Sequence, residues 1–190
     1  MRKIVTCASA LSLFLVLTMF ITLGFVVTVG ASSYYTMLSQ DYLAVNSPLV
    51  ILQNGTDNVS IIYMNDTSAK ISINANETPS TYNYSLNIVN NNASLWEVKL
   101  EYFNYTDINC VNATIIIHNN STSSTQIELS GGNITQYNDY YNLTSNTTIH
   151  IRVQNLVRNS SETTLLHVYL RIRIPNTTTY ASYIITFEFT

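Results

Sequence analysis

The sequence predicts an all-β domain, an antiparallel sandwich of two sheets, preceded by an apolar N-terminal leader helix and an extended tail strand. Three observations lead to this prediction. Apolar and polar residues alternate with a period of two in one segment after another, clusters of Asn, Ser and Thr separate these segments, and Gly and Pro are rare after the leader. Beyond the leader no stretch shows a convincing helical period. Strands with one apolar and one polar face are typical of two-sheet, Ig-like sandwiches.

Residues 1–31 form the apolar leader ahead of a mature chain, 32–190. Two basic residues open the leader, and no charged residue follows within it. Small residues at its end fit a signal-peptidase site between Ala31 and Ser32. The apolar run is also long enough to span a bilayer as a helix. Two interpretations therefore stay open, a cleaved signal peptide or a retained membrane helix.

The alternation also assigns the inward face of each predicted strand. The clearest strands carry the inward sets Tyr82, Tyr84, Leu86, Ile88; Trp96, Val98, Leu100, Tyr102; Val111, Ala113, Ile115, Ile117; Ile149, Ile151, Val153; Leu166, Val168, Leu170, Ile172, Ile174; and Tyr183, Ile185, Phe187, Phe189. Weaker strands are expected at 48–53, 59–64, 69–74, 125–130 and 133–137. Asn83, Ser85, Asn112 and Thr114 then fall on outward faces. We expect a hairpin or bend at Gly131-Gly132 and an exposed loop at 119–125.

Asn-x-Ser/Thr sequons are unusually dense in the mature chain. The fifteen sequons begin at Asn54, Asn58, Asn65, Asn76, Asn83, Asn92, Asn104, Asn112, Asn119, Asn120, Asn133, Asn142, Asn146, Asn159 and Asn176. Random placement of the Asn, Ser and Thr residues present would give roughly five or six. A sequon is used only on a chain that enters a glycosylating compartment. The sequence therefore predicts a secreted, heavily glycosylated surface protein.

Charge and cysteine usage narrow the class of protein further. The mature chain has six Lys or Arg against eleven Asp or Glu, a formal charge of −5, which excludes a basic nucleic-acid-binding surface. With so few charges, we expect glycans to provide solubility. Cys110 is the single cysteine of the mature chain, so no internal disulfide is possible. We expect a buried thiol there, with a bridge between subunits as the alternative.

The sequence shows no pattern typical of catalysis. His118, His150 and His167 are scattered without metal-ligand spacing, and the last two fall on outward strand faces. There is no Gly-rich phosphate loop and no nucleophile elbow. We therefore expect no catalytic residue, no metal ligand and no cofactor, and the chain is not expected to be an enzyme.

Residues 32–47 form a β-prone tail without a sequon, and a bend at Asn46-Ser47-Pro48 separates it from the sandwich, 48–190. Its large side chains are Tyr34, Tyr35, Met37, Leu38, Tyr42 and Leu43. This tail either pairs within its own sheet or adds as a strand to a neighbouring subunit. A head-to-tail contact of the second kind does not close, so it would propagate as a fibre.

Leader, apolar tail, Asn/Thr/Tyr-rich β body and dense sequons together resemble the glycosylated thread-type surface filaments of thermoacidophilic archaea. Those filaments are similar in architecture to bacterial type I pilins and are joined by donor-strand complementation. The resemblance spans the whole chain. It implies a pilin-like sandwich, a donor strand at Tyr34 to Leu43 and an acceptor groove beyond Pro48. A type IV pilin, whose apolar helix stays in the filament, is the alternative, although no charged pre-pilin cleavage site precedes Ile4.

These observations predict a structural subunit of an extracellular, cell-surface filament that polymerises with itself by strand donation. Adhesion or biofilm formation is the expected role. The expected partners are other copies of the chain and its own N-linked glycans, with membrane contact only through residues 4–31 before cleavage and no nucleic acid. The competing prediction is a membrane-anchored, surface-layer-associated or adhesive glycoprotein held by the same residues.

Overall fold

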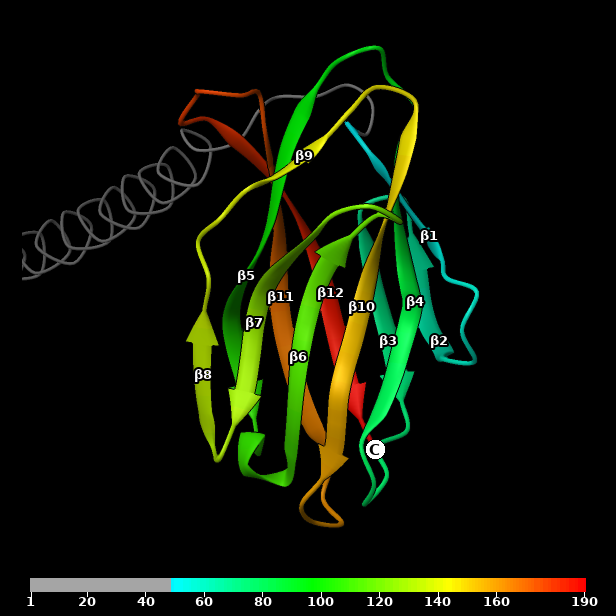
Figure 1. Cartoon of the computed structure of the whole chain (residues 1–190), viewed down its shortest axis with the longest axis vertical. Helices are drawn as coiled ribbons and strands as arrows, with labels where there is room; N and C mark the ends of the chain where they lie inside the picture. The colour runs from blue at the N-terminus through cyan, green and yellow to red at the C-terminus, as the bar shows by residue number, and fades with distance from the viewer. Residues whose placement is uncertain (1–48) are drawn as a thin grey trace, which may run out of the picture. The chain divides into compact units, whose positions relative to one another are not determined.

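The computed structural model describes residues 49–190, which fold as a two-sheet β-sandwich (Figure 1). The predicted leader, the Ala31–Ser32 cleavage site and the tail strand lie outside the described residues. The strands are β1 (Ile51–Asn54), β2 (Ser60–Asn65), β3 (Ser68–Ile73), β4 (Ser80–Asn90), β5 (Trp96–Thr106), β6 (Val111–His118), β7 (Ser123–Ser130), β8 (Asn133–Gln136), β9 (Tyr141–Leu143), β10 (Thr147–Arg158), β11 (Thr164–Arg173) and β12 (Tyr180–Phe189). The predicted all-β sandwich is confirmed.

Each sheet contains six of these strands. Sheet 1 has the order β1-β4-β10-β6-β7-β8, and sheet 2 has the order β2-β3-β12-β11-β5-β9. Neighbouring strands in the described residues are antiparallel except β3 and β12, which run parallel with Ile184 opposite Ser68 and Phe189 opposite Ile73. The expected antiparallel arrangement therefore holds with one exception. That exception brings the last strand beside one from the start of the domain.

The core lies between the two sheets and is built from the alternating apolar residues. Among the predicted inward residues, Leu86, Leu100, Ile115, Val153, Leu170 and Phe187 are all fully buried. Burying a side chain of this size contributes about 1.5–3 kcal/mol. Because successive strand residues point to opposite faces, a shift of one position would move each set into solvent. The hydrophobic alternation therefore fixes the register of most strands.

A bulge in β4 overturns part of the predicted alternation. Tyr82 lies opposite Val153 and Leu86 opposite Ile151, so β4 has extra residues between these two pairs. Ser85 is consequently 0% exposed, and Tyr84 turns outward, with its ring 4.7 Å from that of His150. The predictions of an inward Tyr84 and an outward Ser85 were both wrong. A period of two assumes an unbroken strand, and the bulge interrupts it.

Smaller differences occur where strands begin and end. Ile174 was expected to point inward but is 47% exposed, because β11 ends one residue earlier. The loop predicted at 119–125 is shorter, since β7 already begins at Ser123. Gly131 and Gly132 form the expected β7–β8 hairpin, and both have positive φ. The short strand β9 was missed because three residues are too few to show a period.

The described chain enters the sandwich at one end and finishes at the other (Figure 1). At the first end the Tyr183 hydroxyl accepts a hydrogen bond from the Leu49 N–H at 2.9 Å, and Asn92 Nδ2 donates to the Leu49 carbonyl at 2.6 Å. At the other end the Ala75 N–H donates to the Thr190 carbonyl at 2.8 Å. Helical structure within residues 49–190 amounts to one 3-10 turn, η1 (Ile108–Cys110), and this part of the chain contains no helix able to span a membrane.

Candidate assembly surface and glycan sites

All fifteen sequons lie on described residues, and none of their asparagines is buried. Asn112 and Asn119 are half-buried and the others are exposed. In contrast Asn90, which is not part of a sequon, is 0% exposed, and its Nδ2 donates a hydrogen bond to the Thr144 carbonyl at 2.9 Å. A glycan placed inside the core would unfold the domain. The sequons therefore lie where the fold tolerates sugar.

The sequons are unevenly distributed over the strands. In sheet 1, Asn83 on β4 is exposed and Asn112 on β6 is half-buried between inward-facing residues. Most of the others lie in turns at the two ends of the sandwich. In sheet 2 the central strands β3, β11 and β12 carry none, whereas Asn65 ends the edge strand β2, and Asn104 on β5 and Asn142 on β9 lie at the other side. We call the outer surface of β3, β11 and β12 the bare face.

Ion pairs and cation–π contacts gather on the outer face of sheet 2. The ion pairs of the described residues are Lys70–Glu188 at 2.5 Å, Arg171–Glu101 at 2.7 Å and Arg173–Glu97 at 2.7 Å. Arg171 also lies over the rings of Tyr169 and Tyr180, at 4.3 and 4.4 Å. Such exposed pairs contribute little stability individually. Each joins two neighbouring strands, and together they give the face a fixed polar and aromatic surface.

Two of the three histidines meet on the outer face of sheet 1, which the sequence did not predict. The rings of His118 and His150 are 5.5 Å apart. The two ring nitrogens of His118 lie 2.7 and 3.1 Å from the main-chain carbonyls of Asn83 and Asn119. Burial, followed by the nearby His118, lowers the pKa of His150. In the part of the chain that the structure describes, no group of three or more His, Cys, Asp or Glu is placed to hold a metal ion.

His167 and Cys110 lie apart from this pair. His167 is on the outer face of sheet 2, where Nδ1 lies 3.0 Å from the Thr186 hydroxyl. Its predicted outward position is confirmed, as is that of His150. Cys110 is buried and free, with Sγ 3.8 Å from a Glu162 carboxylate oxygen. The expectation of a buried thiol is confirmed.

Strand β2 is the longest edge strand of the described sandwich. Within residues 49–190 it pairs with β3 alone, whereas the other edge strands β1, β8 and β9 have four, four and three residues. Ile62, the extra residue of a bulge in the pairing with β3, is 51% exposed, and Tyr63 next to it is 54% exposed. The strand Ser60–Asn65 contains neither a charged residue nor Pro. Charged residues, Pro and bulges usually protect an edge strand from pairing with a strand of another chain. Of these three, β2 has only the bulge, so its edge is otherwise open to a further strand.

Strand β5, in contrast, has its uncovered edge filled by side chains. β9 pairs with Trp96–Val98 only. Beyond this point the Leu100 N–H donates to Gln126 Oε1 at 3.0 Å, and the Tyr102 N–H donates to Gln136 Oε1 at 3.1 Å. Gln136 Nε2 donates to the Leu100 carbonyl at 2.8 Å. The two glutamines therefore make the hydrogen bonds that a neighbouring strand would make.

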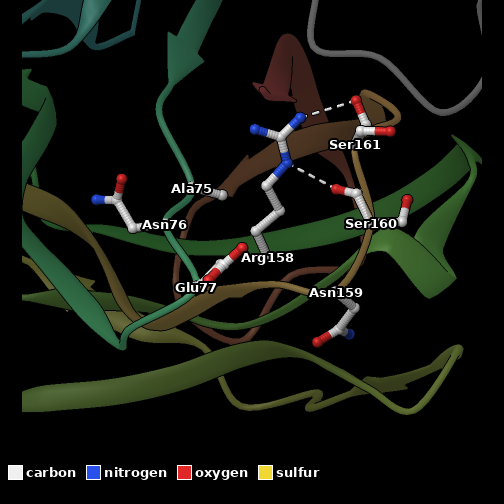
Figure 2. Close-up of a pocket in the computed structure, with 7 residues that line it drawn as sticks. All are labelled: Ala75, Asn76, Glu77, Arg158, Asn159, Ser160 and Ser161. Atoms are coloured by element: carbon white, nitrogen blue, oxygen red, sulfur yellow. Dashed lines mark hydrogen bonds between the residues drawn. The ribbon is translucent and has the colours of Figure 1, made fainter.

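A hollow of about 420 Å³ lies at the end of the sandwich that holds Thr190 (Figure 2). It is lined by Ala75, Asn76, Glu77, Arg158, Asn159, Ser160 and Ser161. The Arg158 guanidinium donates to the main-chain carbonyls of Ser160 and Ser161 at 2.6 and 2.8 Å. Its charge therefore stabilises the β10–β11 connection. Two of the lining residues are sequon asparagines, so sugars attached there would stand at this hollow.

No known family model matches the chain, and no curated protein matches it. Among solved structures, the PapD-like domain 7 of human CEP192 is similar over 78% of this chain and 88% of that one, with 8% identity and a TM-score of 0.42. The N-terminal domain of PorA gives 12% identity and a TM-score of 0.40, over 74% and 97% of the two chains. The CooA pilin subunit from enterotoxigenic Escherichia coli gives 12% and 0.38, over 75% and 98%. Likenesses this distant say nothing of the chain's function.

Proposed function

We propose that this chain is the structural subunit of an extracellular, glycosylated filament, with a mechanical rather than a catalytic role. The tail of one subunit, centred on Tyr34 to Leu43, adds as a strand to the sandwich of the next. Its main chain supplies hydrogen bonds, and its alternate large side chains supply apolar contact. Adhesion or biofilm formation is the biological purpose that such a surface filament would serve.

The observation that supports this proposal best is the open edge of β2. Ile62 and Tyr63 expose apolar surface on an edge strand that pairs with β3 alone within residues 49–190 and has no charge to repel a partner. The comparable stretch of β5 is already occupied by the side chains of Gln126 and Gln136. The sequence offers an apolar, sequon-free segment of the right kind in the tail. We therefore propose β2 as the acceptor.

The tail is long enough to cover the whole of the acceptor strand. Residues 34–43 in extended form span roughly 33 Å, whereas a strand of the length of β2 covers about 20 Å. The described chain starts at one end of the sandwich, beside Tyr183, and Thr190 lies at the other. A tail leaving the first end would thus project away from its own C-terminal end. Subunits joined in this way follow one another head to tail, which produces a fibre.

Charge placed on β2 tests the proposal. In the full chain, Ile62→Lys should abolish filaments in electron micrographs, because a buried lysine at the new strand pair would lack a partner. Ile174→Lys is the matched control, since Ile174 is similarly exposed, 47% against 51%, but lies beyond the end of β11. This control should still form filaments.

Deletion of residues 32–43 should also leave monomers. A peptide of residues 32–46 should bind these monomers and raise their melting temperature, because burying two or three large side chains contributes about 1.5–3 kcal/mol each. The peptide should not bind when Ile62→Lys is combined with the deletion. Filaments from the truncated chain, or equal binding of the peptide with and without Ile62→Lys, would contradict strand addition at β2.

A further inference from the structure

A bulge in β5 places an aromatic residue and a sequon asparagine side by side on one face. Along a regular strand, consecutive residues point to opposite faces. In the pairing with β11, Tyr102 lies opposite Val168 and Asn104 opposite His167, which leaves Phe103 as an extra residue. The Phe103 ring stacks on Tyr169 of the outer face, and Asn104 pairs with an outward residue. Both side chains therefore belong to the outer face of sheet 2.

Phe103 is the exposed end of a face-to-face aromatic stack with Tyr169, which we call the platform. Its ring stacks on that of Tyr169, with centroids 4.1 Å apart and planes 20° from parallel, and the His167 ring is 5.9 Å away. The Arg171 guanidinium lies over the Tyr169 ring, with its Cζ 4.3 Å from the ring centroid. Although it is stacked, Phe103 remains 43% exposed. The platform therefore presents apolar ring surface to whatever lies next to Asn104.

The Asn104 side chain is suited to carry a sugar at this position. It is exposed, and its Oδ1 accepts a hydrogen bond from the Tyr105 N–H at 2.9 Å. This contact uses the carboxamide oxygen, whereas glycosylation takes place at Nδ2. The hydrogen bond orients the amide without engaging the reacting nitrogen. Thr106 completes the sequon.

We propose that Asn104 carries an N-linked glycan whose proximal sugar rings lie on the Phe103–Tyr169 platform. A pyranose ring has a face of C–H groups, and this face is complementary to an exposed aromatic ring. In attachment, Nδ2 loses a proton and bonds to the anomeric carbon of a lipid-linked oligosaccharide, whose phosphate leaves. The inference rests on the glycosylation in the proposed function. The glycan would extend over the edge of the bare face, where β3, β11 and β12 have no sequon of their own.

Two measurements on the native glycoprotein test this inference. Glycopeptide mass spectrometry should find sugar on Asn104. In a double-mutant cycle, Phe103→Leu and Asn104→Gln should be coupled by about fivefold in the unfolding equilibrium constant, as contacting groups are. The coupling should vanish after enzymatic removal of the glycans. Phe103→Leu paired with Asn146→Gln, a sequon in the turn before β10, is the matched control and should show no coupling.

Ring-current shifts provide a readout that stability changes do not affect. Protons of the Asn104 glycan should resonate upfield in wild type and return to ordinary positions in Phe103→Leu. If Asn104 carries a glycan but shows neither coupling with Phe103 nor upfield-shifted sugar protons, the contact between the glycan and the platform is refuted. A bare Asn104 on a chain glycosylated elsewhere would overturn the site while leaving the proposed function intact. Sugar absent from every sequon would instead refute the glycosylation in the proposed function.

Discussion

At the scale of single residues, the contact between His118 and His150 makes the stability of the fold depend on pH. His150 Nδ1 lies 2.7 Å from the Asn87 side-chain oxygen, and the Tyr84 ring meets the His150 ring edge-on. Burial disfavours the charged imidazole, and the His118 ring beside it adds to this effect, so the pKa of His150 is lowered. Tyr84 reaches this cluster only because of the bulge in β4. The alternation in the sequence had predicted that Tyr84 lies in the core.

The pH dependence of stability should reveal this histidine. Because the pKa of His150 is lower in the folded state than in the unfolded chain, the unfolded chain binds the proton more readily. The stability from His150 is therefore complete above its unfolded pKa and is lost as pH falls through the window between the two values. His150→Gln should show a smaller decrease in melting temperature from pH 7 to pH 5 than wild type. His167→Gln, on the other sheet, is the control, and an unchanged pH profile in His150→Gln would contradict the assignment.

At the scale of strands, two strands of sheet 2 differ in how their uncovered edges are filled. β2 exposes an unguarded apolar edge, whereas β5 is closed by side-chain amides from β7 and β8. Gln126 is 0% exposed, and its Nε2 donates to the Ser124 hydroxyl at 2.8 Å. A buried amide is tolerable only when its hydrogen bonds are made. This glutamine therefore connects β5 to the sheet opposite.

Removing that connection should weaken the domain. Gln126→Leu keeps the side-chain volume but leaves the Leu100 N–H buried without its acceptor, which should cost about 1–3 kcal/mol of unfolding free energy. Gln154→Leu is the matched control, because Gln154 is a half-buried strand residue between the buried Val153 and the exposed Asn155. It should change stability by less than about 0.5 kcal/mol. Urea denaturation gives both values, and equal losses would show that Gln126 has no special role.

At the scale of the whole molecule, the domain combines a large apolar core with a surface poor in charge. Charged residues make up 10% of the chain, and three ion pairs on sheet 2 use six of them. Carboxylates also lose their charge in strong acid. In the proposed function, glycans on the exposed sequons supply hydration that does not depend on pH. Because β3, β11 and β12 carry no sequon, the bare face is left for other contacts.

Glycan removal should separate solubility from folding. After enzymatic deglycosylation, or expression in a host without the modification, far-UV circular dichroism should still show the β-sandwich, because the core residues are unchanged. Light scattering should rise, most strongly below about pH 4, where the carboxylates are protonated. A sugar-free chain lacking residues 32–43 that stays monomeric at millimolar concentration across this range would show that the glycans are not needed for solubility.

The sequence by itself determined the fold class and the inward face of most strands. Alternation is a local property, since each residue's face depends on its neighbours in the chain. Sets such as Ile115 with Ile117 and Leu166 with Leu170 are buried as predicted. The outward position of Asn83 was predicted in the same way, although the bulge follows directly after it.

Only the tertiary structure decided which strands pair, where the bulges lie and which edges stay open. The parallel pair of β3 and β12 joins residues more than a hundred positions apart, and no local pattern encodes it. The bulges that move Tyr84 outward and place Phe103 beside Asn104 arise from pairing with β10 and β11. The contacts of Gln126 and Gln136 with β5 likewise cross between the sheets. Such contacts depend on packing between distant segments, which periodicity along one strand does not contain.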